Sequence, residues 1–245
     1  MRRKQDKREG MKNSELSPLL DCDIFVYRVG FAANEEPLEY ALATMRSVLD
    51  NIRDRFPDRK YEKLYLTGKD NFREKVAKRH KYKGNRDPSH KPVHYNDIRD
   101  YLVNVQGAEV IDGQEADDAL GIEQWKNKDK STVIVSIDKD LKMVPGFHYH
   151  PFKDELIYVN LTDANAFFFQ QMLTGDRTDN IHGIKGIGDK TGIKMLAPCN
   201  KDVIDMKKVV VDAYKKAFGE EAQEVYKENA ALLWMRRLPE QECPF

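Results

Sequence analysis

The sequence predicts an α/β fold with a mostly parallel central sheet flanked by helices. Short apolar runs, of which Thr132-Val-Ile-Val-Ser-Ile137 is the clearest, alternate with longer segments whose apolar residues recur at helical spacing. Strands that alternate with helices of this length form βαβ units, so we expect the strands to lie parallel in one sheet. A length of 245 residues suits one such domain with a smaller helical region.

Each expected element rests on its own pattern. The expected strands are short apolar runs at 19–21, 63–67, 109–111 and 132–137. The expected helices carry apolar residues three or four positions apart, and they lie around Phe25 and Tyr27 and over 38–56, 72–83, 93–105 and 116–125. Pro57 ends the second of these helices.

The pattern changes near residue 160. From Thr162 onward helices dominate and strands disappear, so we predict an α/β core over 18–160 and a helical domain over 161–245. Residues 1–17 are predicted to form a flexible basic tail. Trp234-Met-Arg-Arg237, near the end of the chain, is interpreted as a segment that packs on the core.

Composition indicates the compartment. The three cysteines are scattered and have no C-x-x-C spacing, which favours a reducing cytoplasm over a disulfide framework. The first ten residues lack the apolar centre of a signal peptide, and no apolar stretch approaches the roughly 20 residues of a membrane span. We therefore expect a cytoplasmic protein without a membrane partner.

The formal net charge is zero, from 41 basic and 41 acidic residues, but the charges are not evenly spread. Between Lys69 and Arg86 lie eight Lys or Arg residues against two acids, Asp70 and Glu74. Such a run is commonly a solvated helix face. A basic substrate-binding segment beside an acidic metal site would also give zero net charge, so the total excludes neither interpretation.

Acidic residues gather where the expected strands end or just beyond a helix. They are Asp21; Glu115, Asp117 and Asp118; Asp138 and Asp140; and Asp176 and Asp179. Any one group is explained by helix capping or by a turn. Together they repel one another unless a cation lies between them, and oxygen ligands without Cys or His favour Mg²⁺ or Mn²⁺ over zinc. His148 and His150 with Asp154 are interpreted as ordinary strand or turn residues.

A glycine-rich loop follows the last acidic pair. Asp176 and Asp179 lead directly into Gly183, Gly186 and Gly188, and a helix is expected to begin at Asp189-Lys190-Thr191. Backbone N–H groups at a helix start bind phosphate. The segment therefore predicts metal and phosphate chemistry side by side, as on a phosphodiester backbone.

The ordered set of motifs resembles the 5′-nuclease (flap endonuclease) family, especially its stand-alone phage 5′→3′ exonucleases. The resemblance covers residues 19 to about 197 and rests on the following segments. They are Leu20-Asp21 with Tyr27-Arg28, Phe72-Arg73, Tyr82-Lys-Gly-Asn-Arg86, Glu115-Ala-Asp-Asp118, Ser136-Ile-Asp-Lys-Asp140, Gly175-Asp-Arg-Thr-Asp-Asn180 and Gly183-Ile-Lys-Gly-Ile-Gly-Asp-Lys-Thr191. It implies a PIN-like or resolvase-like nuclease core.

The resemblance also implies two metal sites. Asp21, Glu115, Asp117 and Asp118 would build the first, and Asp138, Asp140, Asp176 and Asp179 would build or support the second. Two Mg²⁺ ions, or Mn²⁺, would then activate water and stabilise developing charge.

Two nucleic-acid-binding regions are implied as well. Residues 69–92 resemble the family's helical arch, in which Lys83 and Arg86 reach the scissile phosphate, while Tyr82 and Phe72 either stack on bases or pack internally. Gly183–Thr191 resembles its helix–three-turn–helix, where backbone amides and K⁺ hold duplex phosphates. There Lys185, Lys190 and Lys194 would add sequence-independent affinity.

One position departs from the family pattern. Many members carry a further Asp after the strand that precedes the arch, where this chain has Thr67 and Gly68. Asp70 lies nearby but is displaced, and either it substitutes or the site has one acid fewer.

The expected function is metal-dependent hydrolysis of DNA from 5′ ends or flaps, giving 5′-phosphate products, as in phage replication or recombination. Two alternatives remain: a relative that removes RNA primers from RNA–DNA hybrids, and a catalytically silent protein that binds DNA structures. The residue change at Gly68 favours the silent protein, and the intact carboxylates favour the enzyme.

Overall fold

The structure, a computed structural model, describes residues 12–87, 89–128 and 131–245. Its main sheet has the strand order β3-β2-β1-β4-β5-β6, and β1 to β5 run parallel while β6 pairs antiparallel with β5. The strands are β1 (Ser17–Asp21), β2 (Lys63–Thr67), β3 (Glu109–Ile111), β4 (Thr132–Val135), β5 (Gly146–His150) and β6 (Glu155–Val159). The prediction of a mostly parallel sheet is confirmed.

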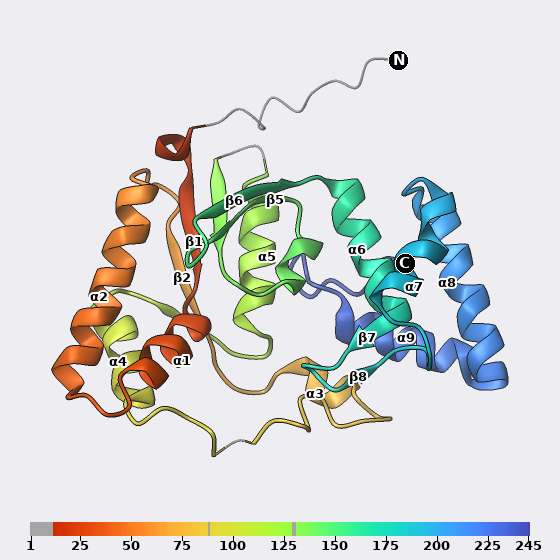
Figure 1. The fold of residues 1–245 in the computed structure, drawn as a ribbon, viewed down its shortest axis with the longest axis horizontal. Coiled ribbons are helices and arrows are strands. Elements are labelled where there is room, and N and C mark those ends of the chain that lie inside the picture. The colour runs from red at the N-terminus through yellow and green to blue at the C-terminus, as the bar shows by residue number, and fades with distance from the viewer. Residues whose placement is uncertain (1–11, 88, 129–130) are drawn as a thin grey trace.

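Helices cover both faces of this sheet (Figure 1). They are α1 (Cys22–Ala32), α2 (Leu38–Arg55), α3 (Phe72–Val76), α4 (Tyr95–Asn104), α5 (Ala116–Lys126), α6 (Leu161–Thr174), α7 (Asp189–Leu196), α8 (Val203–Phe218) and α9 (Ala222–Leu233). Alternate strand residues face opposite layers: Leu20 packs with the cluster of α1, α2 and α4, whereas Leu19 packs with α5 and the C-terminal helices. The sheet therefore lies between two helical layers.

The predicted helix over 72–83 is wrong beyond Val76, and within the described part of 69–92 the helical residues are those of α3. Lys75, Arg79 and Lys83 would stand four residues apart on a helix, where like charges repel. Glu228 of α9 instead accepts hydrogen bonds from the backbone N–H groups of Lys78 and Arg79. The described residues between α3 and α4, which leave out position 88, thus form loop and turn structure (Figure 1).

The expectation that strands disappear after Thr162 is also wrong. A short antiparallel pair, β7 (Gly175–Asp176) and β8 (Ile181–His182), follows α6. The β5–β6 hairpin was not predicted as a pair of strands either. Two-residue strands lack a readable period, and β7–β8 pairs because Gly175 adopts a φ of +71° that allows the chain to leave α6 abruptly.

The predicted boundary near residue 160 coincides with the change from β6 to α6. The helices beyond it nevertheless share one hydrophobic cluster with the sheet, in which Phe168 and Trp234 pack with Ile134. Trp234 is 2% exposed, which confirms that the segment around it packs on the core.

Of the predicted tail, residues 1–11 lie outside the described residues, whereas Leu16 and Ser17 are buried and Ser17 begins β1. Among the described helices, none combines the length and apolar character needed to cross a bilayer.

Candidate metal and nucleic-acid site

Acidic side chains meet at the carboxyl edge of the parallel sheet. Asp21 is the last residue of β1, and Asp138 follows the end of β4, its direct neighbour. Glu115 and Asp117 lie at the start of α5, which follows β3. Because parallel strands end at the same edge, residues far apart in sequence converge there, as the sequence predicted.

The β7–β8 hairpin brings the remaining acids to this edge. Asp176 lies in β7 and Asp179 lies in the turn that joins it to β8. The carboxylates of Asp138, Asp140 and Asp176 are near enough to influence one another's pKa values. A single surface pocket is lined by Glu115, Asp117, Asp138, Asp140, Asp176 and Asp179.

Burial and mutual repulsion hold protons on several of these groups. Burial, and then the charge of Asp23, raises the pKa of Asp21 to about 7. Burial, and then Asp138, raises the pKa of Asp140 to about 8. The pKa of Asp117 also lies well above its usual range, through burial and then the charge of Asp21. These shifts mark a site with excess negative charge.

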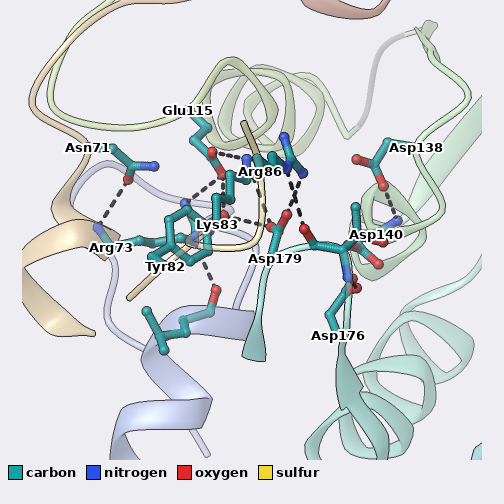
Figure 2. Close-up of polar contacts among 12 residues, drawn as sticks. Asn71, Arg73, Tyr82, Lys83, Arg86, Glu115, Asp138, Asp140, Asp176 and Asp179 are labelled. Atoms are coloured by element: carbon teal, nitrogen blue, oxygen red, sulfur yellow. Dashed lines mark hydrogen bonds and ion pairs between the residues drawn. The ribbon is translucent and has the colours of Figure 1, made fainter. Parts of the chain in front are cut away.

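Cationic side chains from the loop after α3 contact the acids (Figure 2). Lys83 Nζ donates to Glu115 and lies 3.9 Å from Asp179 Oδ2, while Arg86 Nη2 lies 2.6 Å from Asp179 Oδ1. Burial alone would raise the pKa of Glu115, but Lys83 and Arg73 lower it below its usual value. The predicted pair Lys83 and Arg86 is therefore placed directly on the acidic site.

Tyr82 is buried and connects the acids at the start of α5 with those of the β7–β8 turn. Its hydroxyl lies 2.8 Å from Glu115 Oε2 and 2.7 Å from Asp179 Oδ2. Phe72 contacts the guanidinium of Arg236, 3.8 Å from the ring centroid. Of the two roles considered for Tyr82, the structure favours internal packing over base stacking.

Asp118 departs from its expected role as a metal ligand. Its carboxylate is fully buried and accepts from Arg73 Nη1 at 2.5 Å and Nη2 at 3.0 Å. Arg73 also donates to the backbone oxygens of Leu232 and Trp234. On α5, Asp118 is therefore turned to this ion pair, away from the pocket that Asp117 lines.

Close to Thr67 and Gly68, where the acid of the family pattern is absent, lies an acid that the sequence reasoning missed. Asp23, in the first turn of α1, accepts a hydrogen bond from Thr67 N at 2.8 Å, and its charge helps to raise the pKa of Asp21 after burial. The sequence did contain a signal for this acid, since Asp23 stands two residues after Asp21, the acid that ends β1. A Cβ on Gly68 would lie 2.0 Å from Asp112 Oδ1, so this position does not accept an acid as it stands.

Asp70 does not reach the site. It is exposed, has a φ of +61°, and lines none of the pockets that contain the acidic residues described above. Asp70 is thus not among the clustered carboxylates, whereas Asp23 lies near Asp21 and is paired with Arg99 at 3.0 Å.

The glycine loop is exposed and leads into α7. Gly186 has a φ of +86° with open space around it, and Gly188 precedes the first residue of α7. Gly183 differs, since a Cβ there would lie 2.2 Å from the backbone carbon of Thr174. Lys185, Lys190, Thr191 and Lys194 are exposed along the same segment. The predicted residues thus form one surface, in which Gly183 is needed for close packing.

A cleft of about 540 Å³ opens beside the acids. Asp21, Glu115, Asp117 and Asp138 lie along it, together with Tyr27, Arg28, Arg86 and Tyr95. Aromatic and cationic groups next to a carboxylate cluster suit a nucleic-acid strand, because bases stack on rings and phosphates pair with cations. Fold and site together define an α/β protein with an acidic centre beside exposed cationic and aromatic side chains.

Comparison with known proteins agrees with this class. No protein-family profile matches the chain. It is 26% identical over 208 residues to DNA polymerase I of Caldicellulosiruptor bescii, covering 73% of this chain and 24% of the polymerase. It is 25% identical over 206 residues to a 5′-3′ exonuclease of Buchnera aphidicola, covering 73% of this chain and 68% of that protein. The match thus spans about a quarter of the polymerase.

Solved structures share the fold. A bacteriophage T5 5′-exonuclease structure with bound divalent metal ions (zinc) matches with a TM-score of 0.59 and 14% identity, over 89% of this chain and 99% of that one. Flap endonuclease-1 from Methanococcus jannaschii matches with a TM-score of 0.56 and 15% identity, over 94% and 81%. The resemblance noted in the sequence is confirmed: the chain is similar in sequence to a 5′-3′ exonuclease over most of its length, and it shares its fold with the solved 5′-exonuclease and flap endonuclease structures.

The residues of the acidic edge fit a hard divalent cation. Their donor atoms are carboxylate oxygens, and Oδ2 of Asp176 is buried without a hydrogen-bond partner among the described residues. Lys139 Nζ lies 3.5 Å from that oxygen. In the described part of the chain, no three Asp, Glu, His or Cys side chains are arranged to hold one ion together, and cationic side chains contact the acids instead.

Proposed function

We propose that this chain is a metal-dependent 5′→3′ exonuclease and flap endonuclease that hydrolyses DNA phosphodiesters and leaves 5′-phosphate products. The observation that carries the proposal is the contact between Lys83 and Arg86 and the acids Glu115 and Asp179. It places cations that suit a phosphate beside carboxylates that suit metal ions. The similarity to a 5′-3′ exonuclease and to about a quarter of a DNA polymerase I supports the same reaction.

Mg²⁺ or Mn²⁺ would be held by Asp21, Glu115 and Asp117, and by Asp138, Asp140, Asp176 and Asp179. When bound, the ions would supply a water activated for attack and charge to offset the developing negative oxygens. Asp118 is left out of this set because Arg73 occupies it.

The chain's own residues would bind and orient the substrate. Lys83 and Arg86 would exchange their carboxylate partners for oxygens of the scissile phosphate. Tyr82, bonded to both Glu115 and Asp179, would keep the acids of the core and of the β7–β8 turn at a fixed separation. The loop from 69 to 92 would thus close over a 5′ strand without being a continuous helix.

The glycine loop and α7 would form a helix–three-turn–helix that holds duplex DNA away from the cut. Gly186 and Gly188 leave the backbone accessible, and Lys185, Lys190 and Lys194 would pair with phosphates without reading bases. This loop would also bind a K⁺ ion. The protein would act in phage DNA replication or recombination.

The test is cleavage of a 5′-flapped duplex with Mg²⁺ and with EDTA, using Asp138→Asn beside the wild type. We expect 5′-phosphate products from the wild type with Mg²⁺ alone. The variant should lose at least about 100-fold in rate while binding duplex with an affinity within about threefold, since one carboxylate is neutralised without a change in shape. Full Mg²⁺-dependent activity in Asp138→Asn would contradict the assignment. Running an RNA–DNA hybrid in parallel compares the two substrate classes.

A further inference from the structure

A second pocket adjoins the acidic site on the side of the β5–β6 hairpin. Its volume is about 200 Å³, and it lies between the hairpin and the loop that follows β4. Asp138 lines this pocket as well as the acidic one, so the two are neighbours. Since a liquid water occupies about 30 Å³, the space admits a phosphate group.

Lysines give this pocket its charge. Lys139, Lys142 and Lys153 line it, and all three are exposed. Lys139 is paired with Asp176 at 3.5 Å, but within the described residues neither Lys142 nor Lys153 has a carboxylate oxygen within 4.0 Å. Two cations are therefore available for a ligand.

Acids near the pocket do not cancel this charge. Asp154 lies beside Lys153 in sequence, but it accepts from Tyr149 Oη at 3.0 Å and from Arg55 Nη2 at 3.1 Å. Glu155 remains at the rim, and Asp138 belongs to the acidic site. Three lysines thus line the pocket, and of the acids named here Glu155 is the one left to offset their charge.

The histidines add a neutral hydrogen-bonding group. His148 is buried, its Nε2 lies 2.8 Å from Val144 O, and burial followed by the charge of Lys142 lowers its pKa to about 4. His150 differs: its Nδ1 is buried and has no hydrogen-bond partner in the described part of the chain. As the protonated nitrogen of a neutral ring, Nδ1 would donate to an anionic oxygen.

We propose that this pocket binds one phosphodiester of the nucleic-acid backbone, adjacent to the cleavage point, through Lys142, Lys153 and His150. The ligand class is a phosphate, because the pocket combines unpaired lysines with a neutral donor, and Tyr149 in its lining is too buried for base stacking. Its position beside Asp138 sets the path of the strand as it leaves the acidic site. The inference rests on the proposed function for its substrate.

Equilibrium binding in EDTA tests the pocket without cleavage. A fluorescent 5′-flapped duplex is titrated with the full chain, with Lys142→Ala/Lys153→Ala, and with the control Lys60→Ala/Lys126→Ala. Both control lysines are exposed. Lys60 lies in the loop before β2 and Lys126 at the end of α5, at the edge of the sheet opposite the acidic site. We expect the first double variant to bind about tenfold more weakly with a salt slope smaller by about two, and the control to match the wild type.

A scan with single neutral methylphosphonates, within three phosphates of the junction, then identifies the bound group. The wild type should lose affinity at one position where the Lys142→Ala/Lys153→Ala variant loses none. If Lys142→Ala/Lys153→Ala bound as tightly as the control variant, or lost affinity at the same phosphate positions as the wild type, phosphate binding by this pocket would be refuted. The proposed nuclease activity would be unaffected by either result. Binding with the expected pattern but no cleavage with Mg²⁺ would instead overturn the proposed function alone. No binding by the wild type would overturn both.

Discussion

Arg73 and Asp118 form a bidentate ion pair, with distances of 2.5 and 3.0 Å, in the interior of the protein. The pair ties α3, where the basic loop begins, to α5, which carries Glu115 and Asp117 into the site. Arg73 also donates to backbone oxygens at the end of α9, those of Leu232 and Trp234, so three distant parts of the chain meet at one guanidinium. Two adjacent aspartates, Asp117 and Asp118, therefore serve different purposes.

Substituting these neighbours should separate activity from stability. Asp118→Asn leaves the buried Arg73 charge with only Glu115 as an anionic neighbour, at 3.6 Å, and should lower the free energy of unfolding by about 3 kcal/mol. Asp117→Asn removes a repelled carboxylate, so it should abolish Mg²⁺-dependent cleavage without lowering stability. Urea unfolding and a cleavage assay on both variants check this. Equal destabilisation of the two would refute the division of roles.

The acidic site should make the metal-free protein less stable as pH rises. The folded-state pKa of Asp140 is raised to about 8, above the usual 3.8, so the unfolded chain ionises first. The contribution of Asp140 to stability is therefore fully present near pH 4 and is lost progressively as the pH rises toward 8. Asp140→Asn removes this loss and should be more stable than wild type by about 2 kcal/mol at pH 8 in EDTA, with no difference near pH 4.

Divalent metal supplies the matched control for that measurement. Mg²⁺ should raise the Tm of the wild type, because an ion that binds only the folded state stabilises it, and should raise the Tm of Asp140→Asn less. If Asp140→Asn were as stable as wild type at pH 8, or responded equally to Mg²⁺, repulsion at this site would be excluded as the cause.

Asp23 is predicted to replace the acid missing at Thr67 and Gly68. Asp23→Asn retains an oxygen for Thr67 N but removes the charge that pairs with Arg99 at 3.0 Å, so it should lower the free energy of unfolding by about 1 kcal/mol. Loss of the charge should raise the Mg²⁺ concentration needed for half-maximal cleavage by about tenfold, since the metal ligands lose a neighbouring carboxylate. A Mg²⁺ titration that superimposes on the wild type would limit Asp23 to packing.

Gly186→Val tests the phosphate-binding loop. The φ of +86° strains a β-branched residue, and the added side chain covers an open backbone, so duplex affinity should fall about tenfold with little change in cleavage of bound substrate. Gly107→Val is the control, because its φ of +74° and open surroundings impose the same strain far from the site. Equal affinities for the two variants would disprove the role of the loop.

Much of the site could be predicted because its residues lie at strand ends. Asp21 and Asp138 follow apolar runs whose parallel arrangement is dictated by the alternation with helices, so their convergence follows from topology. The run from 72 to 83 was predicted as a helix because its composition includes helix formers, but spacing of like charges and contacts to α9 decided otherwise.

The sequence by itself determined the parallel sheet, the acidic edge and the glycine loop, since each depends on local pattern and chain order. Only the tertiary structure decided that Asp118 pairs with Arg73, that Asp23 stands beside Asp21, and that Lys83 contacts Glu115. The physical reason is that a carboxylate's role depends on the charge that shares its burial. That partner lies 32 residues away for Lys83 and Glu115 and 45 for Arg73 and Asp118, separations at which no sequence spacing specifies the contact.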